Sequence, residues 1–286
     1  MQQRRRSSVL VDLIILAIVV GGGYLAYLTH NELLDWYYLR DYQPPARIAQ
    51  LADQAGMTDK GRKLFYRANP TIDNSRQQLV ADCKIQNDKT IELGCYLSND
   101  KIFLLDITDP ALLGEMTVTA AHETLHAVYD RLGQGEKKRL NSLLEAEATK
   151  LSDDKLTERL SDYDKLEPGE RDNELHSILG SEFAGLSPEL EAYYAKYFSN
   201  RSQVVAYSRQ FNQTFDGLHE QIIVLDAEIK AAKTQMNALL AAGNVPGYNA
   251  MVPGINAKIN SYNSKVELYN RYASSLLGAE SAAASQ

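Results

Sequence analysis

The sequence predicts an α+β protein made of an N-terminal apolar helix, a domain of short strands and helices, and a C-terminal helical hairpin. Three patterns predict this organisation: an apolar run at residues 9–28, strand-like alternation between residues 72 and 107, and apolar residues three and four positions apart beyond residue 210. A hydrophobic content of 44% with 23% charged residues is ordinary for globular proteins and rules out wholesale disorder.

The first 30 residues are typical of a membrane anchor. Arg4, Arg5 and Arg6 precede the apolar run, whose roughly 20 residues span about 30 Å as a helix, the thickness of the bilayer hydrocarbon. Basic residues before the run and acidic residues after it place the N-terminus in the cytoplasm. A cleaved signal peptide is the alternative, although the run is long for one and no A-x-A site follows it. We therefore expect a single-pass protein of the cell membrane whose remaining chain is extracytoplasmic.

A juxtamembrane segment, residues 31–43, follows the anchor. Trp36, Tyr37 and Tyr38 in this segment suit the headgroup region, because amphipathic rings concentrate where apolar and wet surroundings meet. Pro44-Pro45 then interrupts the helical pattern, since proline cannot donate a backbone hydrogen bond. The segment is therefore expected to end at this proline pair and to give way to a separate domain.

Residues 44–200 are predicted to form one domain of short helices and strands. Two short helices come first, at residues 46–55 and 58–68. A small antiparallel sheet is expected next, with hairpin turns at Asn87-Asp88 and Asn99-Asp100. The three runs predicted as its strands are residues 78–86, 90–98 and 101–107.

The two cysteines, Cys83 and Cys95, fall on the first two of these predicted strands. Outside a membrane the surroundings are oxidising, so a disulfide between them is favoured over free thiols. Two cysteines also exclude a disulfide-dense scaffold and any zinc site built from four cysteines.

Four further helices complete the predicted domain, at residues 115–132, 136–151, 173–179 and 188–198. Between the second and the third lies a segment rich in acidic residues and punctuated by proline and glycine. We interpret its charges as a solvated face; they are Asp153, Asp154, Glu158, Asp162 and Asp164.

Residues 201–278 are predicted to form an antiparallel coiled-coil hairpin. Apolar residues recur at alternating spacings of four and three from Phe211 to Leu239, and again from Ile255 to Leu276. Glycines and prolines between residues 243 and 254 prevent one continuous helix, so we expect the two seams to fold back on each other. The small polar residues 279–286 are predicted to be a disordered tail.

The residues with the clearest chemical meaning are His122-Glu123-Thr124-Leu125-His126. Residues four apart share one face of a helix, so His122 and His126 can present two imidazole nitrogens to one metal ion. Two neutral histidines and one carboxylate make a three-ligand zinc site with an open fourth position for water. Glu123, one residue on, can take a proton from that water as a general base.

This motif resembles the HExxH of the zincin metallopeptidases, which lies on their active-site helix. The resemblance covers about residues 75–200. It implies a Zn²⁺ cofactor, hydrolysis of peptide bonds, and a strand along the substrate cleft, for which residues 101–107 are suitably placed. The metzincin form requires a glycine and a third histidine that residues 127–132 lack at the required places. The gluzincin subtype, which takes a glutamate from a second helix, fits better.

Three glutamates compete for the place of third ligand in such a site. Asn173-Glu174-Leu175-His176-Ser177 resembles the second-helix motif of gluzincins, so Glu174 is the preferred ligand. Glu145 stands at an aminopeptidase-like spacing after His126 but lacks that family's neighbouring residues. Glu182 also stays open as a ligand, or otherwise as a carboxylate that holds a histidine ring.

Several other polar residues have two interpretations each. Asp130 either accepts a hydrogen bond from the second histidine of the motif or lies at a solvated helix end. His176 either stabilises an oxyanion or is simply packed in the interior. An aromatic patch lines a cleft or packs on the coiled coil; it consists of Tyr193, Tyr194 and Tyr197.

Taken together, these patterns predict a membrane-anchored zinc metallopeptidase with His122, His126 and Glu174 as metal ligands and Glu123 as the base. The alternative is an envelope interaction protein that acts through the hairpin, with a domain that binds metal and cleaves nothing. The intact Glu123 favours the enzyme. A net charge of −7 argues against nucleic-acid binding. The expected partners are a peptide or protein substrate, the membrane, and a protein bound by the hairpin.

Overall fold

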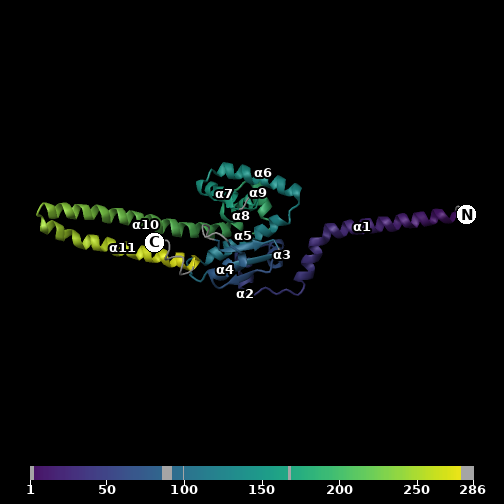
Figure 1. The fold of residues 1–286 in the computed structure, drawn as a ribbon, viewed down its shortest axis with the longest axis horizontal. Helices are drawn as coiled ribbons and strands as arrows, with labels where there is room; N and C mark the ends of the chain where they lie inside the picture. The colour runs from purple at the N-terminus through teal and green to yellow at the C-terminus, as the bar shows by residue number, and fades with distance from the viewer. Residues whose placement is uncertain (1–2, 86–91, 99, 167–168, 278–286) are drawn as a thin grey trace. The chain divides into compact units, whose positions relative to one another are not determined.

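The computed structural model describes residues 3–85, 92–98, 100–166 and 169–277, which are mostly helical with one small mixed sheet (Figure 1). This agrees with the predicted α+β class in a broad sense. The chain divides into two compact units, Met1–Pro44 and Pro45–Gln286. The predicted turn at Asn87-Asp88, Asn99 of the second turn and the predicted tail at residues 279–286 lie outside the described residues.

The first unit contains helix α1 (Gln3–Leu39), whose residues 11–25 are exposed. Within the part of the chain that the structure describes, no single helix combines the length and the apolar composition that a membrane span requires. Val11–Leu25 and Thr29–Leu39 meet that requirement as a pair, with a bend of 62° between them. The single span at residues 9–28 therefore stays a prediction.

The second unit begins with two helices at the predicted positions, α2 (Ala46–Gln54) and α3 (Asp59–Arg67). Thr58 caps α3, because its side chain accepts a hydrogen bond from the backbone nitrogen of Gly61 at 3.2 Å. Both helices bury one apolar face in the hydrophobic core and pack against the central helix α5 (Leu113–Asp130).

The sheet is mixed, so the prediction of an antiparallel sheet is wrong. Its strand order is β1-β3-β2, with β1 (Thr71–Asp73) parallel to β3 (Lys101–Leu105) and β2 (Gly94–Leu97) antiparallel to β3. The second and third predicted strands correspond to β2 and β3. A parallel neighbour is possible because α4 (Arg76–Cys83) intervenes between β1 and the rest of the sheet.

Helix α4 occupies residues that the sequence predicted as a strand, and that prediction is wrong. Ser75 begins the helix by accepting a hydrogen bond from the backbone nitrogen of Gln78 at 3.2 Å. Leu79 is buried beneath it. A short apolar run does not distinguish a strand from a helix by periodicity, and here the capping serine decides between them.

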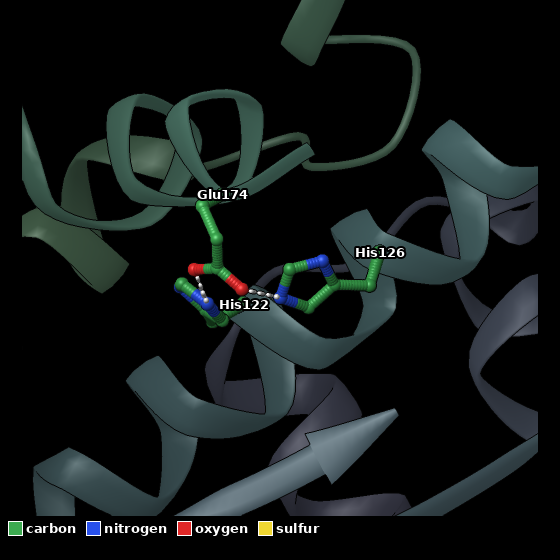
Figure 2. Close-up of side chains that lie close together, drawn as sticks. All are labelled: His122, His126 and Glu174. Carbon is green, nitrogen blue, oxygen red and sulfur yellow. Dashed lines mark ion pairs between the residues drawn. The ribbon is translucent and has the colours of Figure 1, made fainter. Parts of the chain in front are cut away.

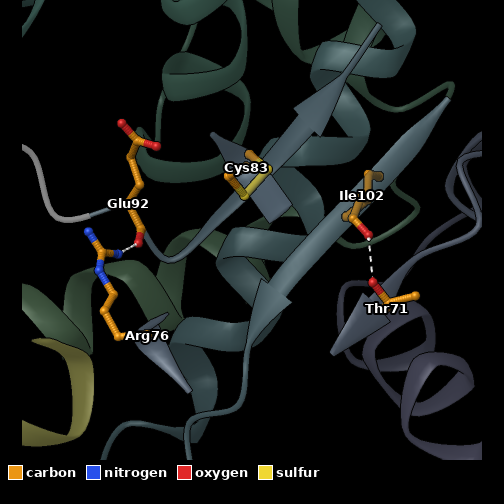
Figure 3. The surroundings of a disulfide bond; sticks show 6 residues. Thr71, Arg76, Cys83, Glu92 and Ile102 are labelled. Atoms are coloured by element: carbon orange, nitrogen blue, oxygen red, sulfur yellow. Dashed lines mark hydrogen bonds between the residues drawn. A yellow bond between two sulfur atoms is a disulfide. The ribbon is translucent and has the colours of Figure 1, made fainter. Parts of the chain in front are cut away.

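The predicted disulfide between Cys83 and Cys95 is present, with the two Cα atoms 5.9 Å apart (Figure 3). Cys83 ends α4 and Cys95 lies on β2, so the bond joins a helix to the sheet and not two neighbouring strands. Figure 3 also shows Arg76 of α4 donating a hydrogen bond to the carbonyl oxygen of Glu92. The two contacts hold α4 against the segment that leads into β2.

Helix α5 is the centre of the second unit. Most of its residues are buried, and it contacts α2, α3, β2, β3 and two helices from later in the chain. A helix that is apolar on nearly all sides belongs in a core. The helices that follow it are α6 (Gln134–Leu151), α7 (Asp154–Leu166), α8 (Arg171–Glu182) and α9 (Pro188–Tyr194). Of these, α7 was not predicted, because its sequence was interpreted only as a solvated acidic face.

The hairpin consists of α10 (Arg201–Ala241) and α11 (Val245–Leu277), which lie side by side (Figure 1). Residues of both predicted seams are buried between them or against the core, namely Leu218, Ile229, Met236, Ile255 and Leu276. Tyr272, which lies outside the predicted seam, is buried as well. The predicted breaker loop to residue 254 is too long. Pro246 lies in the first turn of α11, where a helix needs no donated hydrogen bond, and Pro253 lies within the helix. The first turns of α10 pack on α5 and α8.

Candidate metal centre

The two histidines of the motif lie on α5, and α8 crosses close to them. His122 and His126 are one helical turn apart, with ring centroids 4.8 Å apart. The close crossing requires Gly180, because a Cβ atom at this position would lie 2.4 Å from Leu125 Cδ1 and 2.6 Å from Tyr194 Cε1. The absence of a side chain at one point of α8 therefore brings the other residues of α8 within reach of α5.

Glu174 of α8 points between the two histidines (Figure 2). Its Oε1 is 3.4 Å from His126 Nε2, and its Oε2 is 3.6 Å from His122 Nε2. One ligand atom from each of the three residues lies within 4.8 Å of the other two. The group could therefore hold one metal ion, and the structure brings together the three residues that the sequence singled out as ligands.

Two details of the group fit a metal ion better than ordinary hydrogen bonds. Ligand atoms about 2.0–2.2 Å from a tetrahedral ion lie about 3.3–3.6 Å from one another. Each imidazole lies at such a separation from the Glu174 carboxylate, His126 from Oε1 and His122 from Oε2. In addition, Glu174 Oε2 is buried and has no hydrogen-bond partner. An unsatisfied buried carboxylate oxygen is costly unless a cation compensates it.

Hydrogen bonds from α8 determine which nitrogen each histidine presents. Asn173 Nδ2 donates to Glu170 Oε2, so its Oδ1 is the acceptor that lies 3.0 Å from His126 Nδ1. Ser181 Oγ donates to the Ser177 carbonyl oxygen at 2.7 Å and lies 3.4 Å from His122 Nδ1 as an acceptor. Both Nδ1 atoms therefore carry a proton, and both Nε2 atoms face Glu174, where their lone pairs are available to a metal ion when the imidazoles are neutral.

These two partners were missed by the sequence analysis, which considered Asp130 and Glu182 for this role. Asp130 instead accepts a hydrogen bond from the Tyr96 hydroxyl at 3.1 Å. Glu182 accepts from Arg159. The position of Asn173 directly before Glu174 was visible in the sequence, but its partner depends on how α8 is rotated against α5. No sequence signal singled out the serine.

The two other candidates for third ligand are engaged elsewhere. Both oxygens of Glu145 accept hydrogen bonds from Arg171, at 3.1 and 3.2 Å. Both oxygens of Glu182 accept from Arg159 Nη1, at 2.8 and 3.0 Å. Both carboxylates are therefore paired with arginines, and the metal group contains Glu174 and neither of these two residues.

Electrostatics in the group follow from its burial. Burial by itself raises the pKa of Glu174. The neighbouring His126 and His122 outweigh burial and lower this pKa to about 2. Burial lowers the pKa of His122, yet the carboxylates of Glu174 and Glu123 raise it overall. Glu174 thus stays ionised at neutral pH, in the protonation state that a metal ligand needs.

Glu123 is 5% exposed and lies near the backbone of Tyr96 on the edge strand β2. Burial raises the pKa of Glu123, and the neighbouring histidines oppose this shift. A raised pKa suits a carboxylate that must accept a proton from water near neutral pH.

His176, considered in the sequence for oxyanion stabilisation, is buried away from the metal group. It lies among Tyr129, Tyr193 and Tyr194, and its Nε2 is 3.1 Å from the Tyr193 hydroxyl. Burial lowers its pKa to about 3, so the imidazole is neutral. These contacts assign it to the packing of α8 against α9.

No protein-family model, curated protein or solved structure gives a significant match to this chain. What can be said of the site therefore comes from its own geometry.

Proposed function

We propose that this protein is a membrane-anchored zinc metallopeptidase, with His122, His126 and Glu174 as the zinc ligands. The observation that carries the proposal is the group of two imidazoles and one carboxylate, whose ligand atoms lie within 4.8 Å of one another in the interior of the protein. Two nitrogens and one oxygen form a donor set that suits zinc. Bound there, zinc would polarise a scissile carbonyl group and acidify water.

The residues around the ligands then have defined tasks. Glu123 accepts the proton of the attacking water and afterwards delivers it to the leaving amine, as its buried position beside the ligand histidines allows. Asn173 and Ser181 hold both histidine rings with Nε2 toward the ion. The strand expected along the substrate cleft, residues 101–107, contains β3, and both edges of β3 are already paired, with β1 and β2. Substrate backbone would therefore lie along the edge strand β2, whose Tyr96 is near Glu123.

The location of the catalytic domain is supported by two independent features. Three arginines precede the apolar N-terminal segment, which favours a cytoplasmic N-terminus. The disulfide between Cys83 and Cys95 is expected in an oxidising compartment. Both features favour an anchored protein whose catalytic domain is extracytoplasmic.

The test is to measure zinc content and peptide cleavage in the purified full-length protein. Elemental analysis should give about one zinc per chain. A casein-type substrate should be cleaved, and addition of a chelator should prevent the cleavage. Glu123→Gln should keep zinc but lower turnover by about two to four orders of magnitude, since it removes the base and no ligand. Glu174→Ala should lose zinc, whereas Glu145→Ala should keep it.

The same experiment decides between this function and an interaction protein that acts through the hairpin. Zinc binding in the wild type with no cleavage of any protein substrate would support the second function. Wild-type turnover in Glu123→Gln would contradict the proposed mechanism, and stoichiometric zinc in Glu174→Ala would remove Glu174 from the ligand set.

A further inference from the structure

The metal group is nearly closed to solvent. The side chains of His122, His126 and Glu174 are 12%, 10% and 11% exposed, and Glu123 is 5% exposed. A peptide carbonyl group must approach to bonding distance of an ion in this group before it can be cleaved. Movement of a neighbouring element would give the substrate this access.

Helix α7 borders the site on the side of Glu174. It packs against α8, and its Tyr163 lies close enough to Glu174 that burial and the Glu174 carboxylate together raise the pKa of the Tyr163 hydroxyl. One turn earlier, Arg159 holds both oxygens of Glu182 at the end of α8. The charge of Arg159 is also felt by His122 and Glu174. Two neighbouring side chains of α7 thus close the group from one side.

Helix α7 is held more loosely than the helices that carry the ligands. Among its residues 154–165, the buried ones are Leu156 and Leu160, whereas every residue of α8 from Glu174 to Ser181 is buried. The remaining contacts of α7 that the structure describes are largely ionic. They include the partly exposed pair of Arg159 with Glu182 and the pair of Lys155 with Asp216 on α10, which is so exposed that it contributes little to holding α7.

Residues with left-handed backbone lie near both ends of α7, one of them the C-cap of α6. Ser152 precedes it with φ of 51°, and Gly169 follows it with φ of 104°, so the backbone at both positions lies in the left-handed region. A helix between two such positions can rotate as a unit, because the change in direction is taken up by a few backbone dihedral angles.

We propose that α7 is a lid over the metal group and that the pair of Arg159 with Glu182 is its latch. This inference rests on the proposed peptidase function, because the task of the lid is to admit substrate and then exclude water from the site. Opening breaks the latch and withdraws Tyr163 from Glu174, while α5 and α8 keep the three ligands in place.

Three variants of the full-length protein test the latch. Arg159→Gln and Glu182→Gln each remove one partner, and Lys155→Gln removes a charge from the same helix at an exposed pair away from the ligands. Each protein is loaded with zinc, and zinc release to excess dipicolinate is followed over time. Both latch variants should release zinc about tenfold faster than the wild type, because release requires local opening, and Lys155→Gln should stay near the wild-type rate.

The two latch variants also control for direct Coulomb effects. Losing the Arg159 cation near a bound cation should by itself slow zinc release, whereas losing the Glu182 anion should by itself accelerate it. Acceleration in both variants is therefore the signature of opening. Acceleration in Glu182→Gln alone would indicate simple electrostatics and would overturn the lid.

Hydrogen exchange of the metal-free proteins gives a second measurement that does not require zinc. Backbone amides of α7 should exchange faster than those of α8, and faster again in both latch variants than in Lys155→Gln. Equal protection of α7 and α8 in all proteins would overturn the lid. A chain that binds no zinc but shows the selective exchange of α7 would instead count against the proposed function and leave the lid in place.

Discussion

At the scale of single residues, Asn173 fixes the orientation of His126, one of the two histidines of the metal group. Its Oδ1 accepts from His126 Nδ1 while its amide group donates to Glu170, so both its orientation and the tautomer of His126 are fixed. Asparagine is short and reaches this position only because it precedes Glu174 on α8. Glu174, a proposed ligand, and Asn173, which orients the proposed ligand His126, are therefore positioned by the same turn of α8.

Replacing Asn173 with alanine should weaken zinc binding by about 10- to 100-fold without unfolding the protein, since the ring of His126 would lose its orienting partner. Competition with a chromophoric chelator measures the affinity. Asn212→Ala, at an exposed position of α10, is the matched control and should leave the affinity unchanged. Equal affinities in the two variants would remove Asn173 from the site.

Glu115 gives a prediction about pH. Its Oε2 is buried without a hydrogen-bond partner, and burial raises the pKa of Glu115 to about 8, with the charge of Glu182 adding to the shift. The folded protein therefore binds more protons at this residue than the unfolded chain between about pH 4.5 and 8. Its contribution to stability is lost as pH rises through that window.

The variant Glu115→Gln removes this titration while keeping the shape of the side chain. Its free energy of unfolding should be close to that of the wild type at pH 5 and higher by on the order of 1–3 kcal/mol at pH 8.5. Chemical denaturation at the two pH values measures the difference, and all other groups cancel in the comparison. A difference that does not change with pH would show that Glu115 ionises freely in the folded state.

At the scale of elements, the hairpin buries the apolar stripe of each helix and leaves apolar residues outside that stripe exposed. The seam residue Ile229 is 7% exposed between α10 and α11, whereas Ile223, two turns earlier on the same helix, is 54% exposed. The spacing of four and three residues predicted this difference, because only one stripe of each helix faces the other. The base of α10 is instead fixed by Arg201, which donates to the carbonyl oxygens of Leu179 and Phe183 near the end of α8.

Ile229→Asp should destabilise the hairpin by about 3 kcal/mol or more, because it buries a charge without a partner. Ile223→Asp should change its stability little. Limited proteolysis should cut the first variant within α10 and α11 and spare the second. Both should retain zinc, since the ligands lie on α5 and α8. Loss of zinc in Ile229→Asp alone would reveal coupling between the hairpin and the metal group.

At the scale of the whole molecule, the disulfide links the fold to its compartment. It closes a loop between residues 12 apart in the sequence. By the chain-entropy estimate such a bond stabilises the folded state by about 3 kcal/mol. Cys83→Ser/Cys95→Ser should therefore unfold at lower denaturant concentration than the oxidised wild type, and reductant should shift the wild type to the same midpoint. Free thiols at both positions in protein from intact cells would place the domain in the cytoplasm.

The sequence alone determined the features that depend on neighbours along the chain. Helical geometry placed His122 and His126 on one face, two cysteines allowed one intramolecular pair, and the spacing of apolar residues predicted the hairpin. Each of these follows from local periodicity or from a count of residues. The helices α4 and α7 were not predicted, because short or polar segments carry little periodicity and take their conformation from caps and from contacts with the rest of the fold.

Only the tertiary structure decided which glutamate joins the histidines. Glu145, Glu174 and Glu182 were all open in the sequence, since each lies on a helix that could approach α5. The choice is made by the crossing of α8 over α5, which Gly180 permits, and by the arginines that hold the other two glutamates. Contacts between residues far apart in the chain depend on how whole helices are placed, and local propensity does not determine that placement.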